Sequence, residues 1–183
     1  MKEKLDLIYH QHDVVCNQKY NEYPYSLHLK AVVKQVEYYL PYVKSKMNTL
    51  DERRQFSAEF SWKVDLILAA AGHDLIEDAR MTYNDLVKHL GRFVADLIYA
   101  CTENKGRNRL ERHDDMYFDI LSDERWAVFI KLCDIKANVL YSVLMNSSMY
   151  NKYQKEFPRL YVKLHKQDEF ELIWDDLREL LKM

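Results

Sequence analysis

The chain has 183 residues, of which 48% are hydrophobic, and this size and composition suit one folded domain with its own core. Its 27 lysine and arginine residues against 29 aspartate and glutamate residues give a net charge of −2, so no overall basic field favours nucleic acid or an anionic membrane as a partner. Charges interrupt the apolar stretches well before about 18 residues, which argues against a transmembrane helix.

Helical periodicity dominates the sequence. Because there are only three glycines and three prolines, and apolar residues recur at i, i+3 and i+4, we expect an all-α, single-domain helical bundle, and strands have little support. In chain order, helices are expected near 4–17, 28–46, 51–72, 82–90, 91–102, 108–121, 123–147, 156–166 and 168–182.

Two segments between these helices carry loop signals. Residues 17–27 are predicted to form a loop that ends where the helix carrying His28 begins. Thr82 followed by Asp85 three residues later predicts a capping box at a helix start. Residues 74–82 are therefore a second predicted loop.

The domain plan is simple. A core at about 19–145 carries the polar motifs, and amphipathic segments at about 156–182 are expected to pack against it. The last of these helices also offers a surface for a second copy of the chain, so a homo-oligomer is a possible partner arrangement. The cysteines are an odd, scattered set and the amino terminus has no signal-peptide pattern, which together predict a reduced, cytoplasmic protein: Cys16, Cys101 and Cys133.

The most informative segment is an apolar run that ends in one imidazole and three carboxylates: His73, Asp74, Glu77 and Asp78. Placing four ionisable groups within so short a stretch beside an apolar helix face is costly unless a cation or a substrate compensates their charge. The segment therefore indicates an active site that contains a metal ion.

Two further residues complete a candidate ligand set. His28 opens an apolar helix upstream, and Asp134 lies within another apolar helix downstream. Two imidazoles together with the carboxylates of Asp74 and Asp134 form a mixed nitrogen and oxygen set that suits Mn²⁺, Fe²⁺ or another borderline divalent ion. Singly, these residues are better explained by a helix-end cap, a surface pair or a core histidine; as an ordered set with His73 they favour a metal centre.

This order of residues, and the longer form His-Asp-x-x-Glu-Asp, resembles the HD-domain metal-dependent phosphohydrolases, and in particular the Rel/Spo-type guanosine tetraphosphate hydrolases with their small single-domain versions. The resemblance is carried by four segments: Pro24-Tyr25-x-x-His28, His73-Asp74-Leu75-Ile76-Glu77-Asp78, Thr102-Glu103-x-Lys105 with Arg109 and Arg112, and Lys131-Leu132-x-Asp134-x-Lys136-x-x-Asn138. Four ordered segments are far more specific than a single His-Asp pair.

The resemblance implies a catalytic role for Glu77 and Asp78, which would take the proton of the attacking water or hold that water in line. Taken alone, the pair is better explained by a solvated acidic turn, and the preceding His73-Asp74 reverses that preference. The resemblance also implies a set of substrate-binding residues: Lys19, Lys105, Arg109, Arg112, Lys136 and Asn138. For the arginines, a solvated helix face is the alternative explanation.

Some positions depart from the family pattern. Lys19 stands where family members usually have an arginine that stacks on guanine, and lysine has no planar group to stack. A ring of Tyr20, Tyr23 or Tyr25 is a candidate replacement. Gly72 stands where a bulky apolar residue is usual.

The resemblance implies a metal-dependent hydrolase of the stringent response that removes the 3′-pyrophosphate from guanosine tetra- or pentaphosphate, giving GDP or GTP and pyrophosphate. Its partner would be this small nucleotide. Two alternatives stay open: an HD phosphohydrolase acting on another nucleotide, which Lys19 favours, and a nucleotide-binding module without turnover.

Overall fold

The computed structural model describes residues 1–44 and 59–183, and within them the chain is almost entirely helical, as predicted. The helices in chain order are α1 (Lys2–His10), the π-helix η1 (Gln11–Val15), α2 (Ser26–Lys44), α4 (Glu59–Gly72), α5 (Tyr83–His89), α6 (Arg92–Cys101), α7 (Arg109–Arg112), α8 (Asp115–Asp123), α9 (Arg125–Leu144), α10 (Met149–Leu164) and α11 (Glu171–Leu181). Two short antiparallel strands, β1 (Lys19–Tyr20) and β2 (Tyr23–Pro24), form a hairpin between η1 and α2.

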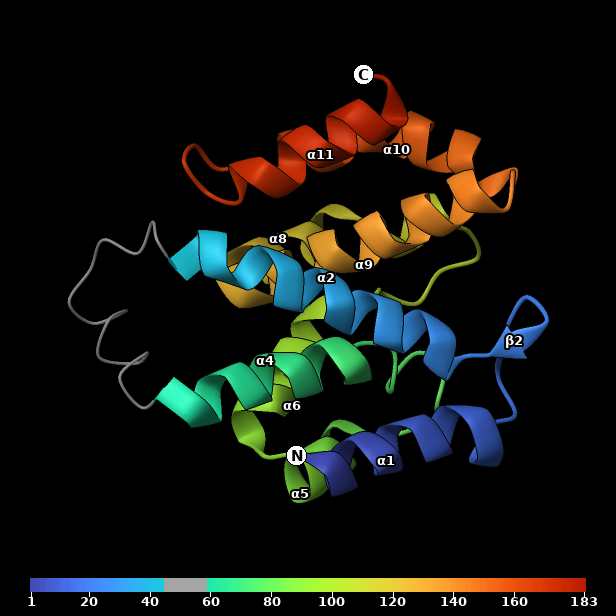
Figure 1. Cartoon of the computed structure of the whole chain (residues 1–183), viewed down its shortest axis with the longest axis vertical. Helices are drawn as coiled ribbons and strands as arrows, with labels where there is room; N and C mark the ends of the chain where they lie inside the picture. Colours follow the sequence, from blue (N-terminus) through green and yellow to red (C-terminus); the bar gives the residue numbers. More distant parts are fainter. Residues whose placement is uncertain (45–58) are drawn as a thin grey trace.

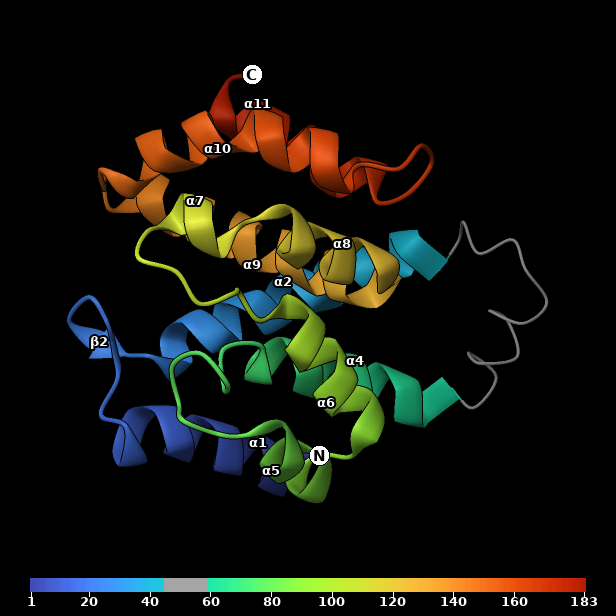
Figure 2. The same cartoon turned by 180° about the vertical axis from the view of Figure 1, so that it is seen from behind.

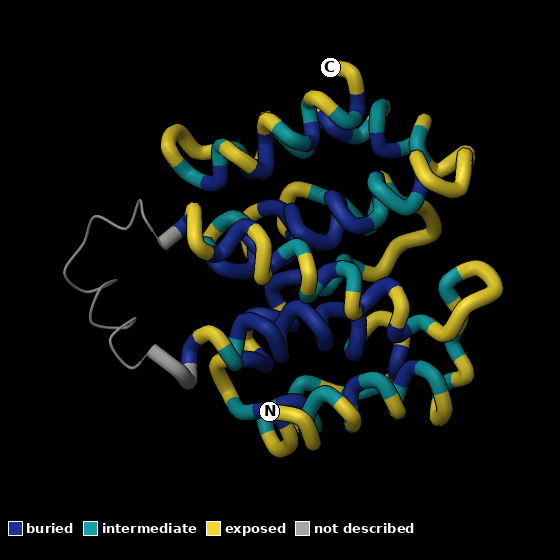
Figure 3. The backbone as a smooth tube through the Cα atoms, in the orientation of Figure 1, coloured by how far each residue is buried: buried dark blue, intermediate teal, exposed yellow. Residues whose placement is uncertain are grey.

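The helices are stacked in tiers (Figure 1). Helices α1 and α5 lie at the end of the molecule that holds the N-terminus, and α10 and α11 form the opposite end with the C-terminus, an arrangement that is also clear from behind in Figure 2. Between them, α2 packs against both α4 and α9. Figure 3 shows that buried backbone is concentrated in these middle tiers.

Most predicted helices are confirmed with shifts of a few residues at their ends, and the predicted loop at 74–82 contains the turn that follows α4. The capping box is also confirmed, because the Thr82 hydroxyl accepts from the Asp85 amide while the Asp85 carboxylate accepts from the Thr82 amide. The part of the predicted helix 51–72 that precedes Glu59 lies outside the described residues.

Three helix predictions differ from the structure. The predicted helix 4–17 widens into the π-helix η1 at Gln11. The single helix predicted at 108–121 is wrong, because Asp114 caps a new helix by accepting a hydrogen bond from the Tyr117 amide and so separates α7 from α8. Helix α10 begins at Met149, earlier than predicted, and continues through Pro158.

Close packing of α4 explains an unusual glycine. Residues 69–71 are alanines with no exposed surface, and they bring α4 against its neighbours. A Cβ at Gly72 would lie 2.9 Å from Ile98 Cδ1 and 3.0 Å from Leu75 Cδ1. A Cβ at this position, immediately before His73, requires the ends of these two side chains to shift, and a bulky residue would displace them further.

A polar contact joins three helices on the far side of α9. The Tyr39 hydroxyl of α2 donates to Asp176 of α11, and Lys136 of α9 forms an ion pair with the same carboxylate at 3.2 Å. This contact fastens α11 to the middle tiers.

None of the described helices combines the length and the apolar character that a membrane span requires.

Candidate active site

Three helices bring four side chains from distant parts of the sequence to one point. His28 lies in the first turn of α2, His73 and Asp74 directly follow α4, and Asp134 lies in the middle of α9. One ligand atom each of His28, His73 and Asp134 lies within 4.8 Å of the others. Asp74 joins them, since its Oδ2 lies 3.1 Å from His73 Nε2 and 3.9 Å from His28 Nε2. We call these four residues the His-Asp cluster.

The protonation of His73 tests whether the His-Asp cluster suits a metal ion. Its Nδ1 lies 2.8 Å from the carbonyl oxygen of Ala70, which can only accept, so Nδ1 carries a proton. The buried Nε2 has no hydrogen-bond partner among the described residues and faces carboxylate oxygens of Asp74 and Asp134 at 3.1 and 3.5 Å. Two carboxylates facing Nε2 call for a positive charge at this point, supplied either by a proton on Nε2 or by a bound cation, and a divalent cation fits this donor set.

Partly buried Tyr25 and Asn138 and buried Lys131 hold the two carboxylates of the cluster in place. The Tyr25 hydroxyl donates to Asp74 Oδ2 at 2.5 Å. The Asn138 amide donates to Asp134 Oδ1 at 2.7 Å, and Lys131 Nζ lies 3.3 Å from the other oxygen of Asp134. Partners of this kind orient metal ligands.

Opposite charges dominate the ionisation of the cluster. Burial lowers the pKa of His73, but Asp74 and Asp134 outweigh it, and the pKa lies well above its ordinary value. Burial raises the pKa of Asp134, but the charges of Lys131 and His73 outweigh it, and this pKa lies well below the ordinary range. The carboxylates are therefore ionised and available as ligands at neutral pH.

Glu77 and Asp78 lie in the turn that follows the cluster residues of α4. Glu77 Oε1 accepts a hydrogen bond from the backbone amide of Glu103 at 2.7 Å. Burial raises the pKa of Glu77 to about 7; the charge of Asp74 acts in the same direction and that of Lys131 against it. Burial and the charge of Asp74 also raise the pKa of Asp78. Two carboxyl groups with raised pKa values next to a cation site are suited to proton transfer.

Glu103 is the centre of a second group of charges. It forms ion pairs with Arg109 at 3.3 Å and Arg112 at 3.4 Å, and its contact with His113 Nε2 is 2.6 Å. Arg109 also pairs with Glu156 of α10 at 2.9 Å. Because the Glu103 amide donates to Glu77, the predicted cations Arg109 and Arg112 lie near Glu77. Both arginines are already paired with carboxylates.

The other predicted substrate-binding residues take different positions. Asn138 contacts the cluster through Asp134. Lys19 is exposed on β1, and Lys105 is exposed beside a pocket of about 170 Å³. Lys136 is not brought to the cluster, because it pairs with Asp176 on the far side of α9.

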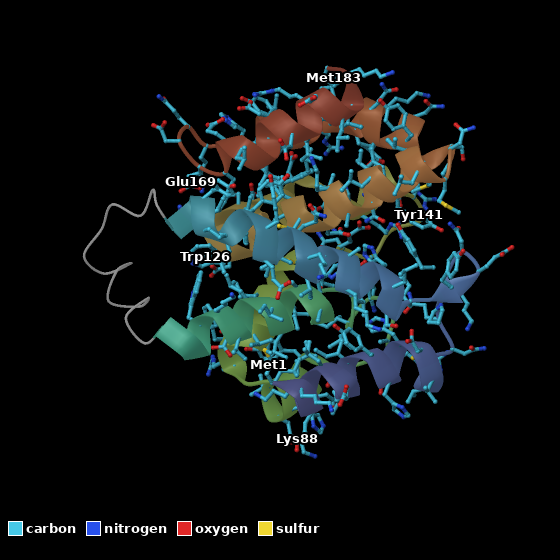
Figure 4. All side chains as sticks on the ribbon, viewed as in Figure 1. Met1, Lys88, Trp126, Tyr141, Glu169 and Met183 are labelled. Carbon is cyan, nitrogen blue, oxygen red and sulfur yellow. The ribbon has the colours of Figure 1, made fainter. Side chains whose placement is uncertain are left out.

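An aromatic pair next to Asn138 was not singled out from the sequence, although Tyr20 was among the candidate rings. The Tyr20 hydroxyl donates to Asn138 Oδ1 at 2.8 Å, and its ring lies 4.9 Å from that of His28 and 4.5 Å from that of Tyr141. Figure 4 labels Tyr141 on the side of the molecule where the hairpin lies. Asn21 of the hairpin donates to the Tyr141 hydroxyl at 2.8 Å.

Sequence reasoning gave no role to Lys131, although it lies in a quoted motif. Its side chain is buried, and Tyr117, Asp134 and Glu77 outweigh the effect of burial, so that its pKa lies well above the ordinary value. Lys131 also lines a cavity of about 310 Å³ between α7, α8, α9 and α10, together with Arg109 and the ring of Tyr153. The sequence did contain a signal for this contact: Lys131 precedes Asp134 by three residues, so the two side chains share one face of a helix.

Comparison with known proteins gives a structural match. No protein-family model and no curated protein matches the sequence. Among solved structures, the chain is similar to one described as a metazoan ortholog of SpoT that hydrolyzes ppGpp and plays a role in starvation responses, with 19% sequence identity, a TM-score of 0.68 and coverage of 97% of this chain and 93% of that chain. At this identity the likeness shows the fold alone: the chain shares the all-α helical fold of that protein.

Proposed function

We propose that this protein is a metal-dependent hydrolase that removes the 3′-pyrophosphate from guanosine tetra- or pentaphosphate, giving GDP or GTP and pyrophosphate. The observation that carries the proposal is the convergence of the His-Asp cluster with Glu77 and Asp78 in the following turn. The neighbour with this fold is described as hydrolysing ppGpp. The setting that the proposal implies is the stringent response in the cytoplasm.

The residues that would hold the metal are His28, His73, Asp74 and Asp134, and we propose Mn²⁺ as the ion. When bound, a divalent ion lowers the pKa of a coordinated water and polarises a phosphoryl oxygen. The protein contributes oriented ligands, because Tyr25 holds Asp74 from one side.

Glu77 and Asp78 are the proposed catalytic residues. With its pKa raised to about 7, Glu77 is partly ionised at neutral pH and is a base strong enough to accept a proton from water. Asp78 lies one residue on, and its Oδ2 accepts a hydrogen bond from Gln18. We propose that this pair orients the attacking water and takes its proton as the bond from the water oxygen to phosphorus forms. The bond between phosphorus and the ribose 3′ oxygen breaks, and that oxygen takes up a proton and leaves as the 3′-hydroxyl of GDP or GTP.

For the substrate, we propose that Asn138 and the cations Arg109 and Arg112 contact the nucleotide and its phosphates, with Lys19 and Lys105 at the edge of the site. The cavity of about 310 Å³ supports this proposal, because Arg109 and Lys131 line it and Lys131 Nζ lies 3.3 Å from the cluster residue Asp134. A role for Lys136 in substrate binding stays a prediction that its ion pair with Asp176 does not favour.

The test is hydrolysis of guanosine tetraphosphate by the purified protein with Mn²⁺, with products separated by ion exchange. An Asp74→Ala variant is the control, because it removes a cluster carboxylate. Release of GDP and pyrophosphate that is lost in Asp74→Ala supports the proposal. No turnover by a protein that holds Mn²⁺ refutes this choice of substrate.

A second candidate is an HD hydrolase that acts on another nucleoside phosphate. It is favoured by the base-binding end of the site, where Lys19 replaces the family arginine and the rings of Tyr20 and Tyr141 lie 4.5 Å apart beside Asn138. A panel of nucleoside phosphates, assayed under the same conditions, separates the two candidates.

A further inference from the structure

The π-helix η1 places a buried histidine near the turn that carries Glu77 and Asp78. His12 has no exposed surface and lies in the wide turn of η1, at the end of α1. Helix α1 contacts α4, and Figure 1 shows the two helices side by side. Single π-helical turns are frequent at functional sites because they redirect side chains. Neither the metal nor the substrate assignments above use His12.

A directed chain of hydrogen bonds runs from His12 to Asp78. Gln18 Nε2 donates to Asp78 Oδ2 at 2.8 Å, and Gln18 Oε1 lies 2.6 Å from His12 Nδ1. Because an ionised carboxylate only accepts, Gln18 must present its NH₂ group to Asp78 and its oxygen to His12. That oxygen also only accepts, so Nδ1 of His12 carries the proton. The Gln18 amide therefore has one orientation, and the His12 imidazole has one tautomer.

Further contacts hold the same turn against η1. The Gln11 side chain donates to the carbonyl oxygen of Ala79 at 2.9 Å, directly after Asp78. The backbone amide of Gln18 donates to the carbonyl oxygen of His12 at 2.9 Å, which fixes the loop that carries the glutamine. The Tyr25 ring stacks on His12 with centroids 5.1 Å apart.

We propose that Gln18 and His12 are positioning residues that hold the Asp78 carboxylate through Oδ2. In residues 1–44 and 59–183, the short hydrogen bond to this carboxylate comes from Gln18, and the Tyr25 hydroxyl, whose single proton goes to Asp74, lies 3.4 Å from the same oxygen, so that both contacts are to Oδ2. Oδ1 is therefore the oxygen left for the proton of the attacking water. This inference rests on the proposed function of Asp78.

Steady-state kinetics of guanosine tetraphosphate hydrolysis is the first part of the test. Gln18→Leu removes both hydrogen bonds at similar size, and we expect kcat to fall by about 10- to 100-fold with KM and metal content near wild type. Gln18→Glu keeps the shape but sets a carboxylate against Asp78, and it should lose as much. The matched control is Gln154→Leu, which removes a hydrogen bond of the same 2.8 Å length to Leu181 in the opposite tier.

A double-mutant cycle separates positioning from a general structural role. If Gln18 acts through Asp78, the Gln18→Leu change slows the Asp78→Asn variant no further. An additive loss, a kcat of Gln18→Leu within twofold of wild type, or an equal loss in Gln154→Leu overturns the proposal. His12→Phe, which keeps a ring to stack on Tyr25, should lower kcat by less than Gln18→Leu because it removes only the outer donor.

A second measurement needs no substrate. In proton–nitrogen correlation spectra of the imidazole, His12 should carry its proton on Nδ1 in the wild type and lose this preference in Gln18→Leu. A wild-type proton on Nε2 overturns the inference even if the enzyme is active. If His12 has the expected tautomer but the protein does not hydrolyse guanosine tetraphosphate, the proposed substrate is refuted. The positioning of Asp78 by Gln18 and His12 is then still supported.

Discussion

Replacing Glu103 by glutamine should make the protein less stable at neutral pH and less sensitive to acid. The Glu103 side chain is 7% exposed and pairs with Arg109, Arg112 and His113. Burial raises the pKa of Glu103, but the hydrogen bond from His113 and the charge of Lys131 outweigh it and lower the pKa to about 2.

The size of the effect follows from the two pKa values. An unfolded glutamate titrates near 4.5, so the folded state holds the ionised form more tightly by a pKa difference of about 2.5, which corresponds to about 3 kcal/mol. Because the folded pKa is depressed, this stabilisation is complete above pH 4.5 and is lost as the pH falls towards 2. At pH 3, about 1 kcal/mol of it should remain.

The assay is urea unfolding of the wild type and Glu103→Gln between pH 7 and pH 3. The difference in free energy of unfolding should shrink from about 3 to about 1 kcal/mol across this range. Glu111→Gln is the control, because Glu111 pairs with the exposed Arg107 and its loss should cost far less. A difference between wild type and Glu103→Gln that is the same at pH 7 and pH 3 would refute the reasoning.

Three further predictions concern the site and its packing. Glu77→Gln or Asp78→Asn should lower turnover of guanosine tetraphosphate by about 10²- to 10⁴-fold while metal content, measured by elemental analysis, stays near wild type; unchanged turnover in both variants contradicts the catalytic assignment. Removing the metal with a chelator should lower Tm. Adding Mn²⁺ at about a thousand times its Kd should then raise the free energy of unfolding by about 4 kcal/mol. A Tm that does not change when Mn²⁺ is added contradicts the metal site. Gly72→Leu should destabilise the fold by about 1–3 kcal/mol in urea unfolding, since a Cβ there lies 2.9 Å from Ile98 Cδ1; a variant as stable as wild type would show that the contact yields.

Periodicity was enough to predict the helical bundle, because each long helix buries one apolar face and that face repeats in the sequence. Periodicity failed where a single side chain determines where a helix ends and the next one begins. Asp114 ends one helix and starts another with one hydrogen bond, inside a stretch whose apolar spacing continues without a break. The widening of the first helix at Gln11 has no spacing signal at all, because a π-helical turn adds one residue to a helix without altering its composition.

The candidate ligands could be named from sequence because their order is itself a motif, but the partners of the predicted cations could not. Glu103 meets Arg109 and Arg112 within one loop and short helix, yet the contact of Arg109 with Glu156 depends on how α10 lies over α7. Such pairing changes what a cation can do, because a phosphate must compete with the carboxylates that already hold it.

The two lysines that flank Asp134 lie on different faces of α9, and the substrate-binding role of Lys136 stays a prediction. At about 100° per residue, Lys136 lies about 200° around α9 from Asp134, whereas Lys131 and Asn138 lie within about 60° of it. The structure agrees, since Lys131 and Asn138 contact the Asp134 carboxylate. Lys136 instead binds Asp176 in α11. The buried cation beside the His-Asp cluster is therefore Lys131, and the charge of Lys136 serves the packing of the final helix.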